Sequence, residues 1–156
     1  MHSTCELSIR PATPADARTV AEFNTRLALE TEGKRLDPDV ALRGASLGLQ
    51  KPECCRYFLA EHEGRLVGQA MITFEWSDWR AGMFWWFQSV YVHPDYRRVG
   101  VFRRLFSHIR GLAEQTPQTC GLRLYVEQHN RPAIETYVRL GLSPSGHAVY
   151  ELDWSQ

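Results

Sequence analysis

Hydrophobic residues recur along this chain with two different periods, which predict strands in some segments and helices in others. Apolar runs bounded by turn residues predict strands. The predicted strands are "LSIRPA", the two arms around Glu63-Gly64 in "RYFLAEHEGRLVGQAMITFEW", residues 83–92, "CGLRLYVE" and "HAVYELDW". The two arms are expected to form a hairpin, because a Gly-containing two-residue loop favours the tight turn that joins antiparallel strands.

Four segments have the three-to-four-residue spacing of a helix. The first follows Thr13, an N-cap with Pro14 at the first position and Asp16 three residues on. Its apolar face also carries one polar residue, Asn24. The others are a helix from Asp37-Pro38 to about Leu49, one built on Phe102, Leu105, Phe106, Ile109 and Ala113, and "NRPAIETYVRLG".

The resulting order is β-α-α-β-β-β-α-β-α-β, which predicts an α/β fold with helices flanking one central sheet. A chain of 156 residues is long enough for a single domain, residues 1–156, with its own core.

The chain carries 18 basic and 18 acidic residues, so bulk attraction to nucleic acid or to an anionic membrane is not expected. The N-terminal residues do not resemble a signal peptide, and no apolar run reaches the length of a membrane span. We therefore expect a soluble cytoplasmic protein with neither a nucleic-acid nor a membrane partner.

The four cysteines, Cys5, Cys54, Cys55 and Cys120, form no C-x-x-C pair and show no metal-ligand spacing with the six histidines. Free thiols and no bound metal are the prediction. Cys120 is interpreted as a buried strand cysteine, with a nucleophilic role as the alternative.

One segment combines glycine with clustered arginine. In "HPDYRRVGVFRR", four arginines surround Gly100 between the most apolar strand and a helix. Amides at a helix start lack internal partners, and glycine lets backbone approach a ligand closely, so the segment predicts a phosphate or pyrophosphate site. The alternative is a solvated helix start. The glycine patterns of P-loop and dinucleotide-binding proteins are both absent.

The segment "VYVHPDYRRVGVFRRLF" resembles the acyl-CoA-binding signature of the GNAT superfamily of N-acetyltransferases, Q/R-x-x-G-x-G/A. The six positions are Arg97, Arg98, Val99, Gly100, Val101 and Phe102. Phe102 departs from the pattern, because Gly or Ala is usual there. A second matching segment, residues 124–142, has Asn130, Ala133, Tyr137 and Gly141 in register. The resemblance covers essentially the whole chain and implies a GNAT-like fold with a mixed, mostly antiparallel sheet.

The resemblance also implies roles for individual residues, with acetyl-CoA as cosubstrate. The backbone of Val90, Tyr91 and Val92 would pair with the pantetheine arm, and amides from Arg98 to Arg103 would hold the pyrophosphate. Asn130 would contact the pantetheine region, or serve only as an N-cap. Tyr137 would be the general acid, the alternative being a core aromatic.

The general base is less readily assigned. An alkylamine has a pKa near 10.4, so about one molecule in a thousand is deprotonated at neutral pH and its proton needs an acceptor. Gln88 stands where many relatives carry an acid. Glu75, at the end of the preceding strand, is the first candidate; Glu30 and Glu32 are the others.

Acidic and aromatic residues suggest the acceptor. Glu30, Glu32, Asp37 and Asp39 crowd one connection, and Trp76, Trp79, Trp85 and Trp86 flank the central turn. This combination favours a cationic amine, with Glu30, Glu32 and Trp76 as its contacts. A polyamine, an amino-acid-like amine or a lysine side chain would each fit, and a homodimer is expected.

The sequence therefore predicts an N-acetyltransferase that moves acetyl from acetyl-CoA directly to a primary amine in a ternary complex. The alternative is an acyl-CoA sensor without catalysis, which Gln88 and Phe102 favour.

Overall fold

The computed structural model describes residues 6–155, which contain five strands, four α-helices and two short 3-10 turns. The elements are β1 (Leu7–Pro11), α1 (Ala17–Glu32), α2 (Pro38–Leu49), β2 (Cys55–His62), β3 (Arg65–Ser77), β4 (Gly82–Val92), α3 (Val101–Gln115), β5 (Thr119–Leu124) and α4 (Arg131–Arg139). This order confirms the prediction up to the last helix. In the part of the chain described, no helix is long and apolar enough to cross a membrane.

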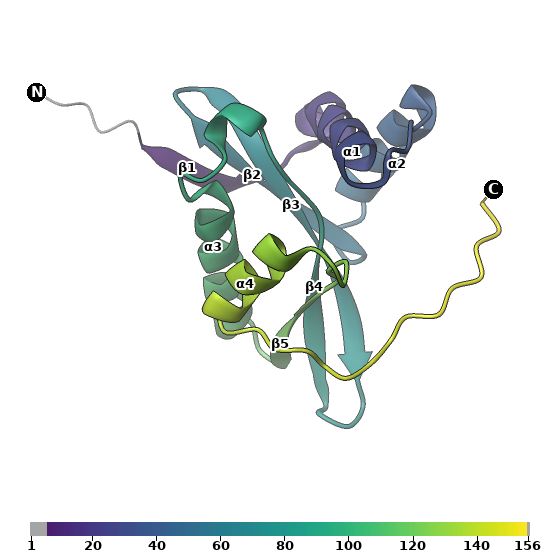
Figure 1. Cartoon of the computed structure of the whole chain (residues 1–156), viewed down its shortest axis with the longest axis vertical. Helices are drawn as coiled ribbons and strands as arrows, with labels where there is room; N and C mark the ends of the chain where they lie inside the picture. The colour runs from purple at the N-terminus through teal and green to yellow at the C-terminus, as the bar shows by residue number, and fades with distance from the viewer. Residues whose placement is uncertain (1–5, 156) are drawn as a thin grey trace, which may run out of the picture. The chain divides into compact units, whose positions relative to one another are not determined.

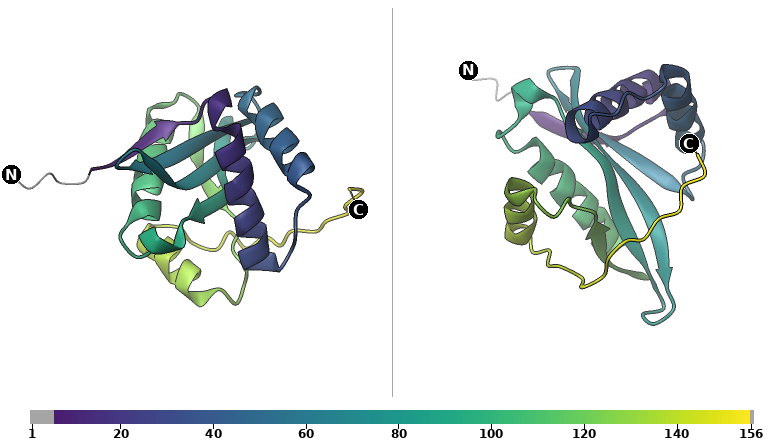
Figure 2. Two further views of the ribbon diagram at one scale, coloured as in Figure 1. Left: turned by 90° about the horizontal axis from the view of Figure 1, so that it is seen from above. Right: turned by 45° about the vertical axis from the view of Figure 1, so that its right-hand side comes forward.

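The sheet has the order β1-β2-β3-β4-β5, antiparallel from β1 to β4 and parallel between β4 and β5. The predicted mixed, mostly antiparallel sheet is therefore confirmed. Helices α1 and α2 cover one face and α3 covers the other (Figure 1, Figure 2). The predicted apolar stripe of α3 is buried against the sheet, where Phe106 stacks on Phe87 of β4 with ring centroids 5.2 Å apart.

The predicted hairpin joins β2 to β3. Its two loop residues, Glu63 and Gly64, both have positive φ, 51° and 75°, the backbone sense of the type I′ turn that matches strand twist.

The chain divides into two compact units, the first ending at Leu124 and the second beginning at Tyr125. The second contains α4, followed by residues 143–155, which form neither helix nor strand. The predicted final strand "HAVYELDW" is therefore wrong for this structure. Its alternating pattern suits a strand, but a strand exists only when a neighbour completes its hydrogen bonds. The single domain stays a prediction.

Three cysteines are free thiols, and Cys5 lies outside the described residues. Cys120 is on β5 but exposed, so the prediction of a buried cysteine is wrong. Strand β5 is the edge of the sheet, and none of its six residues is fully buried.

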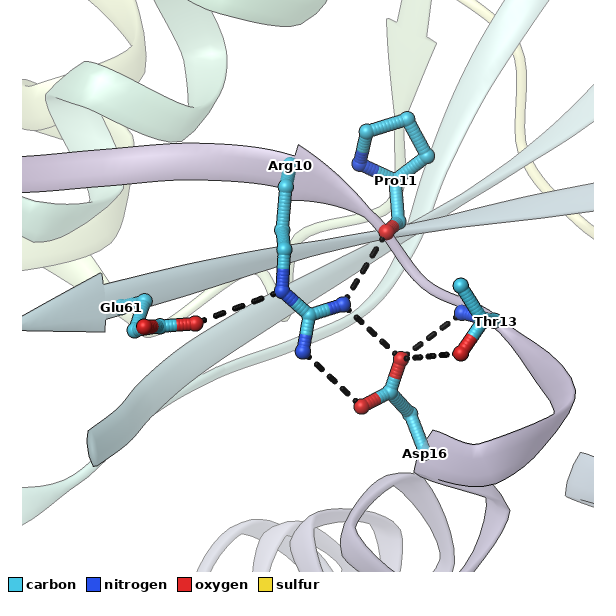
Figure 3. Close-up of polar contacts among 5 residues, drawn as sticks. All are labelled: Arg10, Pro11, Thr13, Asp16 and Glu61. Carbon is cyan, nitrogen blue, oxygen red and sulfur yellow. Dashed lines mark hydrogen bonds and ion pairs between the residues drawn. The ribbon is translucent and has the colours of Figure 1, made fainter. Parts of the chain in front are cut away.

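An ionic cluster ties β1 to the start of α1 and to β2 (Figure 3). The guanidinium of Arg10 donates two 2.9 Å hydrogen bonds to Asp16 and one of 3.3 Å to Glu61. Asp16 also accepts the Thr13 amide at 2.7 Å, which completes the predicted capping box. These bonds, from Arg10 above all, lower the pKa of Asp16 from 3.8 to about 2.

We predict that this cluster makes stability depend on pH in the acid range. Because the folded-state pKa of Asp16 lies below its ordinary value, its contribution is complete above about pH 4 and is lost as pH falls towards 2. Asp16→Asn should lower the free energy of unfolding by about 2 kcal/mol at neutral pH and flatten its decline between pH 4 and 2. Urea unfolding at several pH values measures both effects. Asp39→Asn, at an exposed aspartate of α2, is the control, and an equal change in that variant would contradict the prediction.

Candidate functional site

Strand β4 has a neighbour on both sides along only part of its length. β5 pairs with it from Met83 to Phe87, whereas β3 pairs with it as far as Val92. From Gln88 to Val92 no strand of the first unit borders β4 on the β5 side. The residues predicted to bind an extended ligand arm, Val90, Tyr91 and Val92, all lie on this open edge, which offers backbone donors and acceptors.

Backbone strain marks the same region. In residues 6–155 five non-glycine residues have positive φ, and three of them, Glu63, Ala81 and Gln118, lie in connections between strands or after a helix. The other two are Ser89, inside β4, and Arg98, in the turn that follows. Left-handed backbone costs a non-glycine residue about 1–3 kcal/mol and concentrates at functional sites. The strain therefore supports a site that runs from β4 into the turn.

The turn after β4 leads directly into the N-terminus of α3. Gly100 is the N-cap, with φ of 87°, and provides no side-chain acceptor for the first amides of the helix. Those amides and the positive end of the helix dipole suit an anion. An open groove of about 480 Å³ adjoins them, lined by Leu7, Val99, Gly100, Arg103, Arg104 and Ser107.

The four arginines of this segment divide into two pairs. Arg97 donates to the carbonyl of Val92 at 2.9 Å and pairs with Glu30 at 2.5 Å, and Arg104 donates to the carbonyl of Leu7 at 3.0 Å. The side chains of Arg98 and Arg103 are exposed and form no hydrogen bond or ion pair within the described residues. The first pair holds the turn in place, and the second pair is available to an anionic ligand.

Phe102, the departure from the signature, is half-buried. Its ring lies 6.1 Å from that of Phe106, one turn further along α3. Phe102 therefore extends the apolar stripe of α3 towards the N-terminus of the helix.

Gln88 and Glu75 lie on the same face of the sheet, which Gln69 and Met71 share. Gln88 is paired with Met71 on β3 and donates to the hydroxyl of Thr73 at 2.6 Å. Glu75, two residues after Thr73 on β3, forms an ion pair with Arg123 of β5. Sequence reasoning missed Arg123, whose guanidinium also lies 3.7 Å from the centroid of Phe84. Its charge between two leucines in "CGLRLYVE" was the available signal.

Glu75 and Trp76 are both distant from the turn. Glu75 is opposite Phe84 and Trp76 opposite Met83, eight and nine residues before Val92, a separation of about 25 Å or more along an extended strand. Glu30 contacts the turn through Arg97, and the neighbouring Glu32 is exposed at the end of α1. The structure therefore does not bring Trp76 together with Glu30 and Glu32.

The second unit carries the remaining two predicted site residues. Asn130 is the N-cap of α4, and its side chain accepts the Ala133 amide at 3.3 Å. Tyr137 is partly buried on the same helix, and this burial raises the pKa of its phenol above 10. The phenol therefore carries its proton at neutral pH, as a general acid requires.

Comparisons with known proteins agree on one family. The sequence profile of the Acetyltransferase (GNAT) family matches residues 20–142. A possible acetyltransferase from Clostridium difficile 630 has a structure with a TM-score of 0.88 and 41% identity, covering 96% of this chain and 99% of that one. None of the curated proteins compared with the chain matches it significantly.

Two more distant structures share the fold. A ribosomal-protein-alanine N-acetyltransferase from Brucella melitensis biovar Abortus 2308 has a TM-score of 0.77 at 19% identity, covering 96% of this chain and 100% of that one. A predicted acetyltransferase with acetyl-CoA from Clostridium acetobutylicum has a TM-score of 0.74 at 17% identity, covering 95% and 96%.

We predict opposite effects on stability for alanine at two glycines that border α3 or lie within it. Gly100→Ala should lower the free energy of unfolding by about 1 kcal/mol, because a side chain disfavours the left-handed backbone there. Gly111→Ala should raise it by about 0.5–1 kcal/mol, since Gly111 lies in the helix interior and no atom is within 4 Å of the added carbon. Urea denaturation measures the difference, and equal changes in both variants would exclude the special role of Gly100.

Proposed function

The chain belongs to the GNAT acetyltransferase family, and on this premise we propose that it transfers acetyl from acetyl-CoA directly to a primary amine in a ternary complex. The observation that supports this most is the continuity of available backbone, from the open edge of β4 at Gln88–Val92 to the amides that follow Gly100. An extended arm ending in a pyrophosphate matches that shape, because its amides can pair with a strand edge and its charge with a helix N-terminus.

The groups proposed to bind acetyl-CoA follow from this arrangement. Val90, Tyr91 and Val92 would bind the pantetheine arm through their backbone, with Asn130 as a further contact. Amides from Arg98 to Arg103 and the side chains of Arg98 and Arg103 would bind the phosphates. Arg97 would act indirectly, since its guanidinium already joins Val92 to Glu30.

The proposed chemistry moves one acyl group and two protons. Acetyl-CoA supplies the acyl group as a thioester, the amine nitrogen bonds to the acyl carbon, and the carbon–sulfur bond breaks. Tyr137 gives its phenolic proton to the departing sulfur, and the phenolate regains a proton from solvent. Glu75 is the proposed acceptor of the amine proton. The proton would reach it through a chain of waters, because Glu75 is opposite Phe84, five residues before Ser89, and Arg123 holds the carboxylate.

A cationic acceptor suits the carboxylates that follow Glu30, the residue that contacts the turn through Arg97. Glu32 is exposed at the end of α1, and Asp37 and Asp39 follow at the start of α2. These carboxylates would attract a protonated polyamine, an amino-acid-like amine or a lysine side chain. Trp76 would take part only with an acceptor long enough to reach the β3–β4 hairpin.

A second candidate function is an acyl-CoA sensor that binds without turnover. Two observations favour it: Gln88 replaces an acid and donates to Thr73, and Glu75 is paired with Arg123. Neither residue then offers an unengaged carboxylate to an amine.

We predict that acetyl-CoA releases free thiol in the presence of one class of amine among polyamines, amino acids, aminoglycosides and lysine peptides. Tyr137→Phe should lower kcat by about tenfold to a hundredfold, because the phenolic proton is lost, and change the CoA dissociation constant little. Thiol release measures turnover and calorimetry measures CoA binding.

Two variants serve as controls for this experiment. Gly100→Ala should weaken CoA binding several-fold, whereas Gly111→Ala, at a helix position away from the turn, should not. CoA binding without thiol release from any amine would favour the sensor, and absence of CoA binding would refute both functions.

We also propose that two copies of the chain associate. The side chains of Val149, Tyr150, Leu152 and Trp154 are all exposed, from 68% to 95%, in a segment with a strand-like pattern and no strand. Such a segment favours pairing with another strand. Light scattering should give twice the 18.0 kDa mass of one chain, and Leu152→Asp should shift the mass towards one chain. A single-chain mass for the unaltered protein at high concentration would contradict the proposal.

A further inference from the structure

A buried amide contacts the strained part of β4. Gln69 of β3 has no solvent exposure. Among the described residues the other buried polar or charged side chain, apart from tyrosines, is Asp16, which is 8% exposed. Its amide nitrogen donates to the side-chain oxygen of Asn24 on α1 at 2.7 Å and to the backbone carbonyl of Ser89 at 3.2 Å. Gln69 therefore joins three elements, β3, α1 and β4.

Stability alone does not account for this residue. The side-chain oxygen of Gln69 is buried and has no hydrogen-bond partner within the described residues. A buried acceptor without a partner costs about 1–3 kcal/mol, which an apolar side chain of similar length would avoid. The two hydrogen bonds that Gln69 donates are thus the feature that needs an explanation.

The carbonyl that Gln69 holds belongs to a β-bulge. Gln69 is opposite Tyr91 and Met71 is opposite Gln88, so Ser89 and Val90 together face the single residue Ala70. Ser89 has φ of 50°, which an L residue rarely adopts. Elsewhere in the strand a backbone amide of the neighbouring strand donates to each carbonyl, whereas here the Gln69 side chain is the donor. Its hydrogen bond stabilises the left-handed conformation of Ser89, which a non-glycine residue disfavours.

The bulge has a consequence for the next amide. The carbonyl of Ser89 and the N–H of Val90 belong to one planar trans peptide and point in opposite directions. With the carbonyl held by Gln69, the N–H of Val90 is directed away from Gln69. This peptide lies beyond Phe87, where pairing with β5 has ended, so it belongs to the open edge of β4.

We propose that Gln69, supported by Asn24, is a positioning residue that orients the Ser89–Val90 peptide towards the acyl-thioester end of bound acetyl-CoA. The inference rests on the proposed function, in which a pyrophosphate at the turn leads the pantetheine arm back along β4. Gln69 touches no substrate in this arrangement. It fixes the peptide that does, and Asn24 fixes Gln69.

The first test replaces the amide without changing its size. Gln69→Met should lower kcat by about tenfold while the CoA dissociation constant stays within about threefold, because the phosphate-binding turn is unaltered. Ile72→Val, in the core of the same strand, is the matched control for stability: it should destabilise the protein and leave kcat unchanged. Equal kcat in Gln69→Met and the unaltered protein, or an equal loss in Ile72→Val, would overturn the inference.

The second test uses Asn24 in two variants. Asn24→Asp keeps an oxygen that accepts from Gln69 and should retain kcat within about threefold. Asn24→Leu removes the acceptor and should lower kcat, as Gln69→Met does. If the role of Asn24 were purely structural, the kcat of each variant would instead follow its free energy of unfolding. That result would contradict the inference.

A third measurement does not depend on turnover. In the unaltered protein the NMR resonance of the Val90 amide should shift further with acetyl-CoA than with CoA, and this difference should vanish in Gln69→Met. An identical difference in both proteins would refute the positioning role while leaving the proposed function intact. Failure of the unaltered protein to bind CoA at all would overturn both.

Discussion

The end of pairing between β4 and β5 at Phe87 is the constraint on which the candidate site depends. Up to that residue β4 is an interior strand with neighbours on both sides, and beyond it only β3 remains. An interior strand has no backbone groups to offer a ligand, whereas an open edge has a row of them. The same strand therefore provides core packing at one end, through Trp85 and Phe87, and a binding edge at the other.

The turn that follows this edge is held by contacts on both sides. Arg97 connects the carbonyl of Val92 with Glu30 at the end of α1, and Arg104 connects α3 with β1 through Leu7. These side chains fix the backbone whose amides face the anion site. Of four clustered arginines, two are thus structural and two, Arg98 and Arg103, remain for a ligand. A chain without net charge can present a local anion site in this way, because the site needs oriented donors rather than an excess of basic residues.

The sequence predicted the elements that depend on local pattern. The capping box of Thr13 and Asp16, the Glu63-Gly64 hairpin and the apolar stripe of α3 each follow from residues a few positions apart. It did not predict features that depend on partners far along the chain. The pairs Arg97–Glu30 and Arg123–Glu75 join residues 67 and 48 positions apart, and no periodicity reports on such contacts. The strand expected at "HAVYELDW" failed for the same reason, since its pattern describes a strand's faces but not its neighbour.

Polar residues within apolar patterns were the sequence signal for the rest of the site. Asn24 interrupts the apolar face of the first helix, and Gln69 interrupts the run "LVGQAMI"; in the folded chain the two side chains meet at 2.7 Å. Taken alone, each residue is a single polar position that an apolar pattern tolerates. Together they form a partly buried hydrogen-bonded pair, and the Gln69 amide also donates to the carbonyl of Ser89, the left-handed residue of β4. Unpaired polar groups are rare in protein cores because they cost stability. Asn24 and Gln69 pair with each other and with the carbonyl of Ser89, so the conformation that they stabilise best explains their presence. That conformation is the bulge at Ser89, and it lies where the strand changes from core to binding edge.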